Sequence, residues 1–146
     1  MWQKLVATSN DFVLTILRLF LGFVFFLHGS QKMLGWFGGY GFSGTMHFFT
    51  GMMHIPAFFA FLAIAAEFFG GIGLIIGFLS RIAAFGIMIE MLVAVAMIHR
   101  HFGVFINWTG TQKGEGYEFH LLVFAICIAI IVRGAGALSV DRALTK

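Results

Sequence analysis

Long apolar stretches, separated by short polar or glycine-rich connections, run through most of the chain. Four of them approach the roughly 20 residues that a helix needs to cross a bilayer. They cover residues 12–34, 57–79, 82–98 and about 117–138. Helices joined by short connections pack as neighbours that run in opposite directions. The pattern therefore predicts an all-α integral membrane protein, an antiparallel four-helix transmembrane bundle that forms a single domain over residues 1–146.

The connection between the first two stretches holds an amphipathic segment of its own, residues 43–55. Polar residues recur along one face of it at helical spacing: Ser43, His47, Thr50 and His54. Methionine and phenylalanine side chains occupy another face. The spacing predicts a short interfacial helix, with Ser43 as its N-cap and Pro56 just beyond its end. Such a helix either covers the mouth of the bundle or lies at the membrane surface without contacting a ligand.

Composition narrows the class of protein. Apolar residues make up 60% of the chain and charged residues only 10%, whereas about 25% of an average soluble domain is charged. So few charges exclude a soluble enzyme, a disordered tail and a secreted disulfide scaffold. The nine Lys and Arg residues are scattered singly, so the net charge of +3 does not indicate a nucleic-acid surface. The one cysteine, Cys127, lies inside an apolar run, where a thiol is a poor nucleophile.

Four spans would place both chain ends on one side of the membrane. That side would carry five basic residues: Lys4, Arg81, Arg133, Arg142 and Lys146. The opposite side would carry three, which are Lys32, Arg100 and Lys113. Because Lys and Arg concentrate in cytoplasmic connections, the count predicts a multi-pass protein with cytoplasmic termini.

Ionisable residues inside the apolar stretches are the first candidates for function, because they are costly in hydrocarbon and usually face the bundle interior. A helical projection places Arg18, His28 and Lys32 on one face of the first stretch. Glu67 and Glu90 lie near the middle of the second and third stretches. We expect Arg18, Glu67 and Glu90 to form one buried polar network, in which the Arg18 guanidinium bridges both carboxylates. Such a network either handles protons or substrate, or only fixes the register of the helices.

A second polar group gathers at the outer end of the predicted bundle. Its members are His28, Lys32, Trp36, His99, Tyr117, Glu118 and His120. We expect a pocket that opens to the outer side, with His28 and Lys32 as its principal contacts to a quinone or another ligand. Trp36 and residues 43–55 would form its walls. The alternative is a surface ion pair between Lys32 and Glu118, and no metal site is predicted because the histidines lack a second close pair of ligands.

Several short motifs carry information in their order and spacing. They are Arg18, the stretch HGSQKMLGWFGGYG from His28, Pro56, the stretch EFFGG from Glu67, Gly77 with Arg81, Met91 to His99, FGVFINW and GEGYEFHLL. In these motifs the chain resembles the DoxX family of small membrane proteins over nearly its full length. The resemblance implies a four-helix protein of the bacterial inner membrane with its polar residues at one mouth.

The resemblance also implies a function. Members of the family are known or proposed as small subunits of quinone-linked oxidoreductases, including thiosulfate-oxidising complexes, and as partners in responses to redox stress. We therefore expect a small subunit or accessory of a quinone-linked membrane oxidoreductase complex, with a quinone as candidate cofactor and no catalysis without a partner subunit. Three alternatives remain: a non-catalytic scaffold that binds a soluble partner, a haem-binding bundle that uses His28 and His120, and a small-molecule transporter. A homo-oligomer is compatible with each of them.

Overall fold

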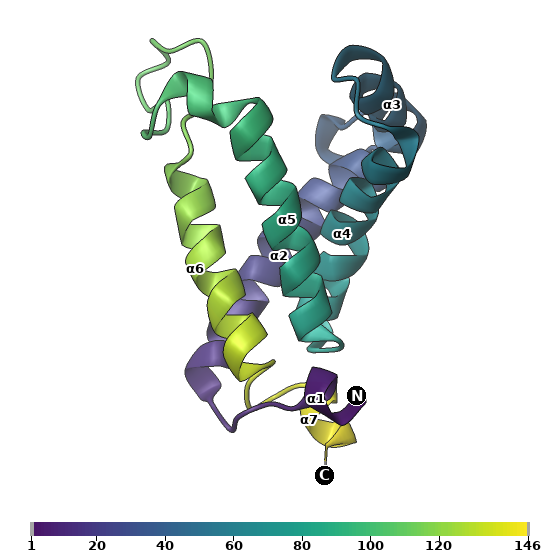
Figure 1. Ribbon diagram of the computed structural model, residues 1–146, viewed down its shortest axis with the longest axis vertical. Helices are drawn as coiled ribbons and strands as arrows, with labels where there is room; N and C mark the ends of the chain where they lie inside the picture. Colours follow the sequence, from purple (N-terminus) through teal and green to yellow (C-terminus); the bar gives the residue numbers. More distant parts are fainter. Residues whose placement is uncertain (1, 146) are drawn as a thin grey trace.

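The computed structural model describes residues 2–145, and every regular element in this range is helical. Four longer helices follow one another: α2 (Phe12–Leu34), α4 (Ala57–Ile76), α5 (Ser80–Met97) and α6 (Glu118–Arg133). The shorter elements are α1 (Trp2–Val6), α3 (Gly41–His47), α7 (Val140–Leu144), the single turns Trp36–Gly38 and His99–Phe102, and the π-helical turn Phe48–Met52. Figure 1 shows α1 and α7 together at one end of the molecule, here called the terminal end. The helix α3 and the connection between α5 and α6 lie at the opposite end, here called the loop end.

Three of the helices, α2, α4 and α5, are long and apolar enough to cross a membrane. The fourth, α6, has only 16 residues. At 1.5 Å per residue it rises about 24 Å, which is less than the hydrocarbon core of about 30 Å. The all-helical fold, with three candidate membrane-spanning helices among residues 2–145, is thus confirmed, whereas the four-helix transmembrane bundle stays a prediction.

Three boundaries of the four long helices differ from the predicted ones by two residues or more. α4 ends three residues early because Gly77 adopts a left-handed conformation with φ 73°. α6 ends five residues early at Gly134, where φ is 88° and a Cβ atom would lie 2.5 Å from the carbonyl oxygen of Ala7. α5 begins at Ser80, two residues early, because the Asp141 carboxylate accepts hydrogen bonds at this helix start.

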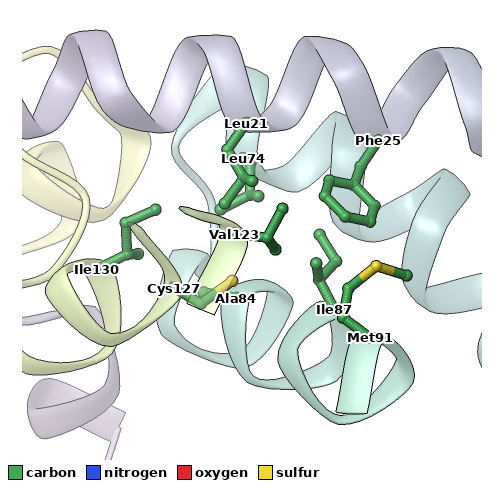
Figure 2. Close-up of a cluster of buried hydrophobic side chains, with 9 residues drawn as sticks. All are labelled: Leu21, Phe25, Leu74, Ala84, Ile87, Met91, Val123, Cys127 and Ile130. Carbon is green, nitrogen blue, oxygen red and sulfur yellow. The ribbon is translucent and has the colours of Figure 1, made fainter. Parts of the chain in front are cut away.

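A cluster of buried apolar side chains lies between the four long helices (Figure 2). Its members are Leu21 and Phe25 of α2, Leu74 of α4, Ala84, Ile87 and Met91 of α5, and Val123, Cys127 and Ile130 of α6. In lipid, helices associate through close packing rather than through the hydrophobic effect. The interlocking side chains therefore hold the helices together, and the Cys127 thiol is enclosed among them.

The helices α2 and α4 approach each other closely because glycines stand at their contact. A Cβ atom at Gly29 would lie 2.5 Å from Cα of Phe68, and one at Gly71 would lie 2.5 Å from the backbone nitrogen of Phe26. No larger residue fits at either position without moving a backbone. These contacts fix the register between the two helices, and thereby decide which polar side chains meet farther along them.

A short helix is present in the segment predicted to be helical, with different bounds, while its interfacial position stays a prediction. α3 begins at Gly41 and passes directly into the π-helical turn Phe48–Met52. Ser43 therefore lies inside the helix, and its predicted role as N-cap is wrong. Thr45 Oγ1 donates a hydrogen bond of 3.3 Å to the carbonyl oxygen of Lys32, which joins α3 to the last turn of α2.

Two charged side chains, Arg18 and Asp141, join the helices at the terminal end. The Arg18 guanidinium donates hydrogen bonds to four carbonyl oxygens, those of Leu74, Ile75, Ala135 and Leu138. The Asp141 carboxylate accepts hydrogen bonds of 2.7 and 3.0 Å from the amides of Leu79 and Ser80. A cation at the end of α4 and an anion at the start of α5 both complement the helix dipoles. Together they fix the turn between these two helices.

Candidate functional site

A cavity of about 450 Å³ lies at the loop end, between α2, α4, α5 and α6. Most of its lining is apolar: Phe25, Phe48, Phe49, Met53, Ile55, Ala63, Met91, Val93, Ala94, Met97, Ile98, Ile106 and Phe119, with Gly116. Its polar lining consists of His28, Lys32, Glu67, Glu90, His99, Glu115 and His120. Ligand sites typically have volumes of about 300–1,000 Å³ and combine apolar walls with a few placed polar groups. The cavity has both properties.

Three charged side chains from three helices meet at this cavity: Lys32 of α2, Glu67 of α4 and Glu90 of α5, here called the Lys32 triad. The Lys32 ammonium forms an ion pair with Glu67 Oε2 and lies 4.0 Å from Glu90 Oε1. The Glu67 residue is only 2% exposed, and the side chain of Glu90 is 11% exposed. A buried carboxylate is strongly unfavourable unless a cation or hydrogen-bond donors accompany it. Lys32 therefore stabilises the two carboxyl groups at once.

The triad corrects the predicted network. Glu67 and Glu90 do lie together, but the cation beside them is Lys32, whereas Arg18 binds carbonyl oxygens at the terminal end. Arg18 and Lys32 stand roughly 21 Å apart along the axis of α2, at 1.5 Å per residue. The close contact at Gly29 sets Lys32, one turn later, opposite Glu67. The prediction that Arg18 bridges the two carboxylates is therefore wrong.

Two histidines form a second polar feature of the cavity. The ring centroids of His99 and His120 lie 4.2 Å apart, and His99 Nδ1 lies 2.8 Å from the carbonyl oxygen of Glu115. His120 is buried. His28 also lines the cavity, but it is an exposed residue. Imidazole nitrogens donate or accept hydrogen bonds according to tautomer. Among residues 2–145, no three His, Cys, Asp or Glu side chains lie close enough together to hold a metal ion.

The structure places some of the predicted pocket residues at the cavity and others outside it. His28, Lys32, His99 and His120 line it, and so do four residues of the 43–55 segment. Trp36, Tyr117 and Glu118 are not part of the lining. Trp36 is exposed in the turn after α2, because Gly35 ends that helix. The Glu118 carboxylate accepts a hydrogen bond of 2.9 Å from the amide of Ile106, while Lys32 pairs with Glu67, so the alternative of a surface ion pair between Lys32 and Glu118 does not form.

The connection between α5 and α6 contributes in a way that sequence reasoning missed. Amides of residues 116–118 donate hydrogen bonds to carbonyl oxygens of residues 103–105, and Glu115 Oε2 accepts a hydrogen bond of 2.7 Å from the amide of Asn107. The connection is therefore a closed, hydrogen-bonded loop rather than an open one. It brings Ile106 and Glu115 to the cavity. The signal in the sequence was the stretch GEGYE, whose carboxylates serve as acceptors for backbone amides.

Residues 13–100, more than half of the chain, match the model of the DoxX family. The chain belongs to the DoxX family. The resemblance seen in its motifs is thereby confirmed. The matched part contains α2, α4 and α5, and so the whole Lys32 triad, whereas α6 lies beyond it.

Two curated relatives align with this DoxX chain over most of their length. It is 30% identical over 137 residues to "Inner membrane protein YqjF" of Escherichia coli (strain K12), an alignment that covers 94% of this chain and 95% of that one. It is 32% identical over 131 residues to "Putative oxidoreductase CatD" of Bacillus subtilis (strain 168), with 90% and 86% covered. No solved structure matches the DoxX chain at a significant level.

Proposed function

We propose that this DoxX protein is a membrane subunit of a quinone-linked oxidoreductase complex in the bacterial inner membrane, and that its loop-end cavity holds the quinone head group. The cavity carries the proposal, because it joins apolar walls to a small set of hydrogen-bonding side chains. The printed names of the two relatives, "Inner membrane protein YqjF" and "Putative oxidoreductase CatD", support the location and the reaction class.

The lining suits a quinone chemically. A quinone head group is a flat apolar ring with two carbonyl oxygens, and it is joined to an apolar tail. Phe25, Phe49 and Met53 provide apolar contacts for the ring, while His28 and His120 provide hydrogen bonds for its oxygens. The Lys32 triad adds carboxyl groups that exchange protons, which quinone reduction and quinol oxidation both require.

Electron transfer is assigned to a partner subunit. The one cysteine of the chain, Cys127, is fully buried in the apolar core and does not reach the cavity. In this proposal the DoxX chain binds the quinone and handles protons, while a second subunit carries the redox group. The count of Lys and Arg favours a cytoplasmic terminal end, and in this proposal the cavity therefore lies at the outer side.

Quinone binding to the purified protein tests the proposal. Titration of the protein in lipid nanodiscs with a short-tailed benzoquinone, followed by calorimetry, should show one saturable site per chain. Ala94 lines the cavity, whereas Ala96, on the same helix, is exposed away from it. Ala94→Phe should weaken binding by about tenfold or more, which corresponds to about 1.4 kcal/mol, and Ala96→Phe should leave it unchanged. Unsaturable uptake that is equal in both variants would contradict the proposal.

One observation favours a second function, a non-catalytic scaffold for a soluble protein. Trp108 is 83% exposed and Phe105 is 69% exposed, both on the hydrogen-bonded loop between α5 and α6. Large aromatic side chains are prominent among the residues that dominate protein interfaces. A protein that copurifies with the wild type but not with Trp108→Ser, in a preparation that contains no quinone, would favour the scaffold over the quinone site.

A further inference from the structure

The two carboxyl groups of the Lys32 triad lie beside a single ammonium group. Glu67 Oε2 forms an ion pair with Lys32 Nζ, and Glu90 Oε1 lies 4.0 Å from that same nitrogen. Among the described residues, no N–H or O–H group donates to the buried Oε2 atom of Glu90. An ionised carboxylate only accepts hydrogen bonds, so an ionised Glu90 would hold a buried negative charge with one oxygen that has no donor. A proton held by one of the two carboxyl groups supplies a donor and removes one of the two negative charges.

The charges around the pair favour the same arrangement. The other titratable side chains that line the cavity are Lys32 and His28 of α2, His99, Glu115 and His120. Lys32 is the one Lys or Arg in this lining. Glu115 is itself acidic and cannot balance the two carboxylates, and its own carboxylate accepts a hydrogen bond from the amide of Asn107. Two ionised carboxylates and one ammonium would leave a net negative charge in a largely apolar cavity, which is unfavourable, whereas one added proton makes the triad neutral.

We infer that Glu67 and Glu90 share one proton beside the Lys32 ammonium, so that the cavity holds a neutral, proton-loaded triad. The use of this proton rests on the proposed function, although its presence does not. The proton passes to an electron-rich oxygen of a bound ligand: an O–H bond at the carboxyl pair breaks and an O–H bond on the ligand oxygen forms. The carboxylate left behind stays beside the Lys32 ammonium, and water at the cavity mouth supplies the next proton.

Infrared spectroscopy of the ligand-free protein in lipid nanodiscs tests the inference. A protonated carboxyl group has its own C=O stretching band, which shifts when the protein is transferred to D₂O. The wild type should show this band, and Glu67→Gln and Glu90→Gln should each remove it, because the one remaining carboxyl group then ionises fully beside Lys32. Lys32→Met should strengthen the band, since two carboxyl groups without a cation both hold protons.

Glu118→Gln is the matched control. The Glu118 carboxylate accepts a hydrogen bond from the amide of Ile106 and lies outside the cavity lining, so this variant should keep the band. A wild-type spectrum that is identical to those of Glu67→Gln and Glu90→Gln in the protonated-carboxyl region would overturn the inference. Where one of these variants does not fold, the other decides, because each removes the shared proton by itself. If the protein shows the band but binds no quinone, the proposed function is wrong and the inference of a shared proton still holds.

Discussion

Replacing Arg18 by methionine should destabilise the terminal end of the protein and leave the loop-end cavity intact. The Arg18 guanidinium binds four carbonyl oxygens. Those of Leu74 and Ile75 belong to the last turn of α4, where carbonyl oxygens lack intrahelical partners. A methionine side chain fills much of the same volume but donates no hydrogen bond. It would also leave the nearby Asp141 carboxylate without its opposite charge.

The expected magnitude follows from these contacts. Hydrogen bonds that involve a charged group contribute about 1.5–3 kcal/mol each. The four bonds share one side chain and are therefore not additive. Removing one partner of a buried charged site costs about 3–5 kcal/mol, and we expect a loss of this size in the free energy of unfolding. Arg18→Lys keeps the charge but loses the planar set of donors, so it should fall between the wild type and Arg18→Met.

The assay is unfolding in mixed micelles with an increasing fraction of SDS, followed by circular dichroism, together with quinone titration of the folded variants. Arg18→Met should lose stability but bind quinone with wild-type affinity. Lys32→Met, which alters the cavity itself, should weaken quinone binding. A loss below about 1 kcal/mol for Arg18→Met, the average effect of a point mutation, or a loss of quinone binding without a loss of stability, would refute the assignment of Arg18 to the terminal end.

The remaining predictions concern the helix contact, the loop and the orientation. Gly29→Leu should lower stability by about 3 kcal/mol, because its Cβ atom would lie 2.5 Å from Cα of Phe68, and a variant with a wild-type melting temperature in detergent would contradict this contact. Glu118→Ala should speed hydrogen–deuterium exchange at the amide of Ile106, which loses its acceptor; unchanged exchange would count against the closed loop. Alkaline phosphatase fused within residues 109–113 should be active, and a fusion at the C-terminal end of the sequence inactive, if the terminal end faces the cytoplasm. The reverse pattern would contradict the orientation.

Hydropathy alone sufficed to predict α2, α4 and α5, because the bilayer fixes how long an apolar helix must be to cross it. The end of α6 could not be predicted in this way. Residues 134–138, Gly-Ala-Gly-Ala-Leu, carry no charge and therefore extend the apolar stretch, although the glycines directly after Arg133 are a local signal for a helix end. The close contact of Gly134 with Ala7, which joins opposite ends of the sequence, has no local signal.

The members of the candidate site could be predicted, but their partners could not. A helical projection placed Arg18, His28 and Lys32 on one face of α2, yet it contains no information on the register between α2 and α4. The register depends on the glycine contacts near Gly29, which form only in the packed structure. Glu118 illustrates the same limit, because a carboxylate at the start of a helix can pair with a lysine or accept a backbone amide, and the loop geometry decides between them.

The position of a bound quinone is the most direct measurement of the proposed function. A photoreactive azido-quinone, cross-linked in bacterial membranes and mapped by mass spectrometry, should label peptides of α2 around His28 and of α5 around Ala94, which line the cavity. Ala94→Phe should suppress this labelling, and Ala96→Phe should not. Labelling confined to the exposed side chains of Phe20 and Phe58, and unchanged by Ala94→Phe, would contradict a quinone site in the cavity.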